Sequence, residues 1–175
     1  STARNSRNWL LDQISNFPEN NDNFPNLYPE IDIGFGSFAR KTKTRPLDDI
    51  DLMVGIKADG CTYYERSWDD IELKFPENYS GKLKKYAKTL DSSGLSSTRI
   101  TNAFKSELSK VSQYSSAEIK RDGEAATLKL KSYTWNFDIV PCFLTSPDSD
   151  GNSYYLIPNR SGSWKKTNPK TDRDR

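Results

Sequence analysis

Residues 36–54 constrain this chain most, because they join a Gly-Ser turn, a basic segment and an alternating strand that carries two aspartates. Ile50 and Leu52 alternate with Asp49 and Asp51, which is the period of a β-strand with one apolar and one polar face. Both aspartates are therefore predicted to leave the same face, roughly 7 Å apart at the backbone. Two carboxylates that converge to about 4 Å repel by ~1 kcal/mol in water and by ~4 kcal/mol in a partly buried site. A divalent cation between them removes that repulsion, so the pair indicates a metal site.

The residues before this strand are suited to holding a phosphate tail. Gly36-Ser37 follows a short β-capable run, residues 32–35, so we expect a strand, a tight turn and a helix start in that order. Backbone N–H groups at a helix start, together with a serine hydroxyl, bind phosphate well. The basic residues that could neutralise the remaining phosphate charge are Arg40, Lys41, Lys43 and Arg45.

Asp138 is the candidate third carboxylate. It stands between the apolar Phe137 and Ile139 on a predicted strand that precedes Pro141. If this strand lies beside that of Asp49, the three acids can hold a pair of metal ions about 4 Å apart. Each piece alone more often reflects a solvated acid, a turn or an exposed basic face. Their joint occurrence in this order indicates chemistry.

Composition removes several competing kinds of site. The chain has no histidine, and its two cysteines, Cys61 and Cys142, are far apart, which excludes zinc sites, Ser-His-Asp triads and Cys-His pairs. A net charge of +2 gives no argument for a nucleic-acid coating protein, so a nucleic-acid partner stays open. No apolar run reaches the roughly 20 residues of a membrane span, and the first 17 residues do not resemble a signal peptide. We therefore expect a cytoplasmic protein without a membrane partner.

The remaining patterns predict an α+β fold. Helices are expected over residues 1–17, ended by Pro18, over residues 83–90, and over residues 100–111 after a Ser96-Ser97 start signal. An antiparallel hairpin is expected around Asp122-Gly123, and the predicted strands are residues 50–56, 117–121, 125–131, 135–139 and 154–157. Residues 60–79 give no clear period, and the basic segment 159–175 is expected to be a loop.

Gly36-Ser37, Asp49-x-Asp51 and Asp138 together resemble the signature of the polymerase-beta-like nucleotidyltransferases. This resemblance implies their fold, in which a mixed or antiparallel central sheet is flanked by helices. Within that superfamily the chain is similar to the bacterial CD-NTases, relatives of oligoadenylate synthetase and cyclic GMP-AMP synthase. The segments that carry this similarity are residues 36–42, 45–51, 137–141, 155–158 and 164–169, within an overall match over residues 32–168.

The resemblance also implies an activity. It implies that Asp49 and Asp51 bind two Mg²⁺ ions, for which Mn²⁺ could substitute, and that Asp138 binds the catalytic ion and helps to deprotonate an attacking ribose hydroxyl. ATP, another nucleoside triphosphate or both would be joined into a cyclic di- or trinucleotide, typically in anti-phage signalling, and a regulatory protein partner is left open. The residues implied in nucleotide binding are Gly36, Ser37, Arg40 and Lys41.

The same resemblance suggests how the chain is organised. Residues 1–175 would form the N-terminal lobe of a catalytic domain, with a leading helix over 1–17, a core over 32–158 and a basic connection over 159–175 toward a C-terminal helical lobe. Activity is therefore expected of a longer protein rather than of residues 1–175 alone.

Two other functions are compatible with the residues. The same metal chemistry could transfer nucleotides to an RNA end or to a protein side chain. The fold could also serve as a non-catalytic nucleotide-binding or partner-docking module, although simple binding needs fewer acids than the three found here. Among the aromatic residues, packing roles are expected for Trp9, Trp135 and Phe137, whereas the roles of Tyr63, Tyr64 and Trp68 are open.

Overall fold

The computed structural model describes residues 2–32, 49–111, 119–121, 128–131 and 136–167, without the side chains of residues 2–3, 30–32, 49–51, 119–121 and 129–131. Its helices are α1 Thr2–Ser15, α2 Phe17–Asn20, the 3-10 helix η1 Lys82–Tyr86 and α4 Ser97–Leu108. Its strands are β1 Leu27–Asp32, β2 Asp49–Ile56, β3 Thr62–Ser67, β4 Asp70–Lys74, β5 Ile119–Arg121, β6 Leu128–Lys131, β7 Asn136–Leu144, β8 Tyr155–Pro158 and β9 Trp164–Thr167.

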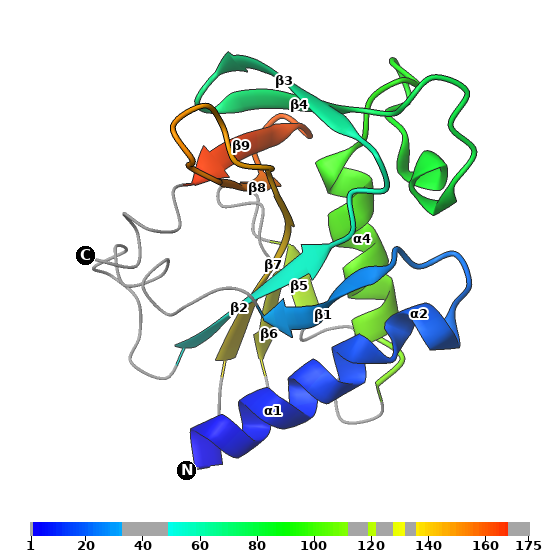
Figure 1. The fold of residues 1–175 in the computed structure, drawn as a ribbon. Coiled ribbons are helices and arrows are strands. Elements are labelled where there is room, and N and C mark those ends of the chain that lie inside the picture. Colours follow the sequence, from blue (N-terminus) through cyan, green and yellow to red (C-terminus); the bar gives the residue numbers. More distant parts are fainter. Residues whose placement is uncertain (1, 33–48, 112–118, 122–127, 132–135, 168–175) are drawn as a thin grey trace.

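The strands form one nine-stranded mixed sheet in the order β1-β2-β7-β8-β9-β4-β3, with β6 also paired to β7 and β5 paired to β6 (Figure 1). Strands β2 and β7 are parallel, and every other described pair is antiparallel. Strand β7 organises the sheet, because its first part pairs with both β2 and β6 and its last residues pair with β8. The expected α+β class and mixed sheet are confirmed.

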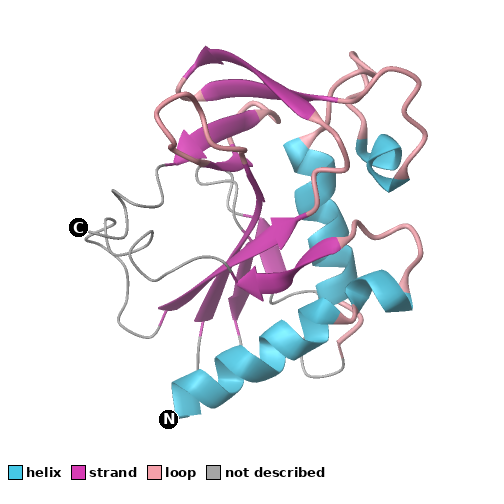
Figure 2. Ribbon diagram, viewed as in Figure 1, coloured by secondary structure: helices cyan, strands magenta, loops and turns pink. Residues whose placement is uncertain are grey.

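The described helices pack against one face of this sheet (Figure 2). The main apolar core joins Leu10 and Ile14 of α1 and Phe104 of α4 to Leu52 of β2 and Ile139 of β7. Helix α4 begins where the sequence predicted, because the Ser96 hydroxyl accepts a hydrogen bond from the backbone N–H of Arg99 and caps the helix.

A second, smaller apolar cluster contains Met53, Val140, Cys142, Tyr155 and Ile157. Successive residues of a strand point to opposite faces, so Met53 and Val140 lie on the face opposite to the Leu52 and Ile139 side of the core. Strand β2 was predicted to have one polar face, and this is wrong for its second half, where residues 52–56 are all buried.

Several predicted elements differ from the structure. The helix expected over 83–90 is limited to η1, because Ala87 forms an isolated bridge with Leu95 and Leu90 is 100% exposed. Pro18 does not end the helical region, since it occupies the first turn of α2, where a missing N–H is tolerated. Residues 62–67 and 70–74, for which no element was predicted, form the β3–β4 hairpin. The segment expected to be a loop after residue 159 contains strand β9.

The remaining predictions are confirmed in part. Strand β1 begins at Leu27 and ends at Asp32, so most of the predicted strand over 32–35 lies outside the described residues. Strands β5 and β6 form the expected antiparallel hairpin, with Asp122-Gly123 also outside the described residues. Strand β7 extends beyond Pro141 to Leu144, and β8 matches its prediction closely.

Candidate active site

The parallel pairing of β2 and β7 brings two of the predicted site residues together. Asp51 and Asp138 are direct Cα partners in this register, and Asp49 is the partner of Asn136. Neighbouring strands lie about 4.8 Å apart, so the backbones of Asp51 and Asp138 are close although the two residues are far apart in the sequence. The expectation that the strand of Asp138 lies beside that of Asp49 is therefore confirmed.

Asp138 occupies an unusually buried position for a carboxylate. It is 4% exposed, and its chain neighbours Phe137 and Ile139 belong to the main core. Val140 and Cys142, which follow at the same strand parity, belong to the second apolar cluster. Carboxylates are rarely buried without charged or hydrogen-bonding partners. Burial of Asp138 therefore implies a partner for its carboxylate, and the proposed site must be compatible with this burial.

The other predicted site residues are less completely described. Gly36, Ser37, Arg40 and Lys41 lie in the segment 33–48, outside the described residues. The backbones of Asp49 and Asp51 are described within β2, whereas their side chains are not. Among the side chains that are described, no group of three or more Asp, Glu, Cys or His residues could hold a metal ion. The assignment of these residues to a metal and nucleotide site stays a prediction.

Strand register also places the backbones of two lysines near the acids. The sequence pattern had not linked these lysines to the acids. Lys129 of β6 is the Cα partner of Asp138, and Lys120 of β5 is the partner of Lys129. The alternation of Leu128 and Leu130 with lysine was visible in the sequence. The residue that each lysine would face on the neighbouring strand was not visible, because strand register depends on the pairing partner.

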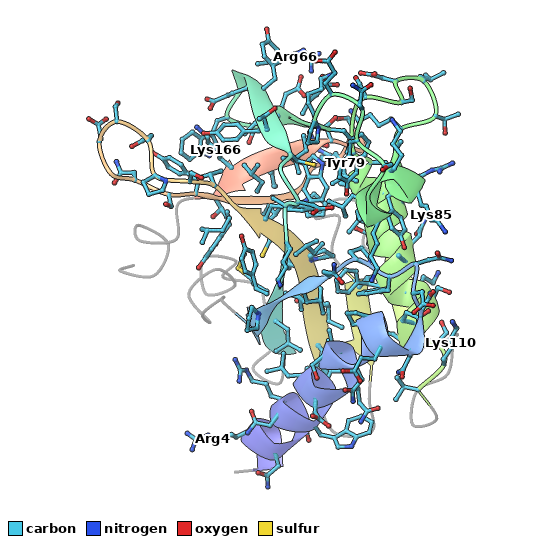
Figure 3. The ribbon with its side chains drawn as sticks, turned by 45° about the vertical axis from the view of Figure 1, so that its right-hand side comes forward. Arg4, Arg66, Tyr79, Lys85, Lys110 and Lys166 are labelled. Carbon is cyan, nitrogen blue, oxygen red and sulfur yellow. The ribbon has the colours of Figure 1, made fainter. Side chains whose placement is uncertain are left out.

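Two of the three open aromatic residues, Tyr63 and Trp68, contact Lys166, and the ring centroid of Tyr64 lies 5.4 Å from the guanidinium carbon of Arg66. Lys166 of β9 lies with its ammonium 5.6 Å from the Tyr63 ring centroid, 5.5 Å from that of Trp68 and 4.6 Å from that of Tyr154, and it forms an ion pair with Glu65 (Figure 3). These cation–π contacts stabilise the β3–β4 hairpin against β9. Of the aromatics expected to pack, Phe137 is buried and Trp9 is partly buried, and Trp135 lies outside the described residues.

A second charged group supports the same region. The Glu72 carboxylate of β4 accepts hydrogen bonds from Arg66 at 3.1 Å and from Lys88 at 3.3 Å, and Lys74 lies 3.1 Å from it. Burial would raise the pKa of Glu72, but these cationic partners outweigh it and lower the pKa to about 2. Glu72 therefore has partners that account for its burial and is not a candidate for acid–base chemistry.

The chain is similar over nearly its whole length to a curated protein. No family model matches the chain. Over 174 residues, 99% of its length, the chain is 51% identical to a protein of Bacillus cereus strain VD146 described as a probable cyclic nucleotide synthase. The description of that relative agrees with the kind of activity that the resemblance implied. The chain spans about half the length of that curated relative, 51% of it.

Among the described helices, none is both long and apolar enough to cross a membrane.

Proposed function

We propose that the protein containing these residues is a metal-dependent nucleotidyltransferase that joins nucleoside triphosphates into a cyclic di- or trinucleotide. The observation that carries the proposal is the pairing of Asp51 with Asp138 on adjacent parallel strands, with Asp49 two positions along β2. The 51% identity to a probable cyclic nucleotide synthase supports the same activity.

The donor set fits magnesium. Carboxylate oxygens are the ligands that Mg²⁺ prefers, and two acids at paired strand positions are costly unless a cation offsets their repulsion. Asp49, Asp51 and Asp138 would hold the ions, and Mn²⁺ favours the same oxygen donors. When bound, the ions supply charge stabilisation for the entering and departing oxygens of phosphoryl transfer.

The chain's own residues would position the reactants. We assign the donor triphosphate to Gly36 and Ser37, with Arg40 and Lys41 neutralising its charge. We assign to Asp138 the acceptance of the proton from the attacking ribose hydroxyl, because this residue is only 4% exposed and little bulk water competes for the carboxylate. Attack on the α-phosphate then proceeds in line, and pyrophosphate leaves.

The larger architecture belongs to this proposal too. We infer that the sheet and helices form a polymerase-beta-like catalytic lobe and that the reaction takes place in the cytoplasm as part of anti-phage signalling.

The test is product analysis with the full-length protein. It is incubated with Mg²⁺ or Mn²⁺ and four labelled nucleoside triphosphates, and the products are resolved before and after phosphatase treatment. Phosphatase-resistant products whose mass fits a cyclic di- or trinucleotide support the proposal. Label transferred to added RNA or to protein would show the other branch of this chemistry, and nucleotide binding without any transfer would show a non-catalytic module; both outcomes contradict the proposal.

A further inference from the structure

Four charged residues occupy one line across four neighbouring strands. Asp51 of β2 pairs with Asp138 of β7, which pairs with Lys129 of β6, which pairs with Lys120 of β5. Because β2 and β6 pair with the same stretch of β7, they lie at its two opposite edges. Across the sheet, the order of these residues is therefore Asp51, Asp138, Lys129 and Lys120, each on the next strand.

The adjacent line shows which face these positions share. Leu52, Ile139 and Leu128 are the next residues of their strands, are register partners in the same way, and are all buried in the main core. Successive strand positions alternate between faces. The line of acids and lysines accordingly belongs to the opposite face, away from the described helices.

The order of charges along the line matches the order of groups in the proposed reaction. The proposed function assigns Asp51 to the metal ions and Asp138 to the attacking hydroxyl, so an attacking nucleotide that lies on the side away from Asp51 would extend from Asp138 toward β6 and β5. At about 4.8 Å per strand, the backbone of Lys129 lies one step and that of Lys120 two steps beyond Asp138. Lysine ammonium groups are common partners of phosphate oxygens.

We propose that Lys129 and Lys120 form the site for the 5′-phosphates of the attacking nucleotide. The site would select a phosphorylated acceptor, a nucleoside triphosphate or the linear intermediate with its 5′-triphosphate, over an unphosphorylated nucleoside. The proposal rests on the proposed nucleotidyl transfer, which defines which nucleotide attacks. A purely structural alternative is that Lys129 serves as the counter-ion of Asp138.

The experiment measures binding of the second nucleotide by the full-length protein. The donor site is first saturated with an α,β-methylene nucleoside triphosphate in Mg²⁺, which blocks transfer. Isothermal titration then compares the same base as a second α,β-methylene triphosphate and as the plain nucleoside. The variants are Lys129→Gln, Lys129→Arg, Lys120→Gln and the control Lys57→Gln, which removes an exposed lysine just beyond β2.

For Lys129→Gln we expect the Kd of the triphosphate to rise about tenfold to a hundredfold, the range for a lost charge-assisted hydrogen bond, with the nucleoside Kd unchanged. Lys129→Arg should retain most of the affinity, and Lys57→Gln should behave as wild type. Equal losses for triphosphate and nucleoside, or no loss for either, would overturn the proposal. If Lys129→Gln does not fold, Lys120→Gln decides the question, and an unchanged preference for the triphosphate there overturns it.

A kinetic measurement separates this proposal from the proposed function. A wild-type protein that makes no product from four nucleoside triphosphates contradicts nucleotidyl transfer itself. An active wild type whose Lys129→Gln variant keeps the KM of the wild type for the phosphorylated acceptor contradicts only the phosphate site.

Discussion

Asp138 is only 4% exposed, which is unusual for a charged side chain on a strand. Burying an acid between Phe137 and Ile139 costs hydration that an uncharged side chain would not lose. The direct partner across the parallel pair is a second acid, Asp51. Two acids whose side chains approach each other repel, and a bound divalent ion would offset that repulsion.

We expect Asp51→Asn to abolish nucleotide incorporation by the full-length protein and to leave the fold intact or slightly stabilised without metal. The substitution removes a proposed metal ligand and one of two like charges. The measurements are product formation and the thermal midpoint with EDTA and with Mg²⁺. Mg²⁺ should raise the midpoint of the wild type and not that of the variant. Product formation at the wild-type rate would refute the metal assignment.

Glu72 provides a prediction about pH. Its folded pKa of about 2 lies below its ordinary value of 4.5, so the carboxylate stabilises the fold above about pH 4.5 and loses this contribution as the pH falls toward about 2. Glu72→Gln should therefore be less stable than wild type at neutral pH, and the difference should shrink through this range. Urea unfolding at several pH values measures it.

The control for this prediction is Glu77→Gln, which changes an exposed carboxylate in the loop after β4. Its stability should follow that of the wild type throughout. A constant difference between Glu72→Gln and wild type from neutral to acidic pH would contradict the assigned role of the Arg66, Lys74 and Lys88 partners.

At the scale of elements, local sequence determined some parts of the fold well and others poorly. Helix α4 was predictable because its apolar period coincides with real burial and because Ser96 supplies the cap. Strand β2 was recognisable from its alternating pattern, although both faces of its second half are buried. The helix expected over 83–90 failed because helical spacing of apolar residues does not guarantee that they face a core, and Leu90 faces solvent. Strand β3 gave no signal because it is exposed along its whole length, and its Tyr63 contacts Lys166 rather than a core.

Some residues of the candidate site could be predicted from local sequence, and others could not. The acids were recognisable because Asp-x-Asp on an alternating strand and a lone Asp on an apolar strand are unusual locally. Lys129 and Lys120 were not recognisable as their neighbours, since a one-residue change of register would have moved both lysines to the other face. Pairing between distant strands is a property of the assembled sheet.

Helix α4 offers a test of its cap. Ser96→Ala removes the acceptor of the Arg99 N–H, a hydrogen bond of 3.1 Å at a buried residue, and should lower the free energy of unfolding by about 1 kcal/mol. Ser106→Ala, at an exposed position of the same helix, is the matched control and should change it by less than about 0.5 kcal/mol. Denaturant unfolding monitored by circular dichroism compares them, and equal effects would show that the cap adds nothing.

At the scale of the whole molecule, alkylation of the two cysteines can measure local exposure and unfolding of the sheet separately. Burial raises the pKa of Cys142, which lies fully buried in the second apolar cluster. Cys61 is partly buried, and burial together with the nearby Asp59 charge raises its pKa to about 11. We expect iodoacetamide to alkylate Cys61 slowly in native buffer and Cys142 only when the sheet unfolds, as followed by mass spectrometry across a urea series. Equal labelling rates without urea would show that the second cluster opens locally.

The parallel pairing of β2 and β7 has a consequence for when the protein can act. Parallel neighbours cannot be joined by a tight turn, so a long intervening segment must be made and arranged before Asp138 can meet Asp51. A nascent chain released before β7 would carry Asp51 without its register partner Asp138. Under the proposed function, no transfer could therefore begin before β7 had joined the sheet, whatever other segments the reaction also needs.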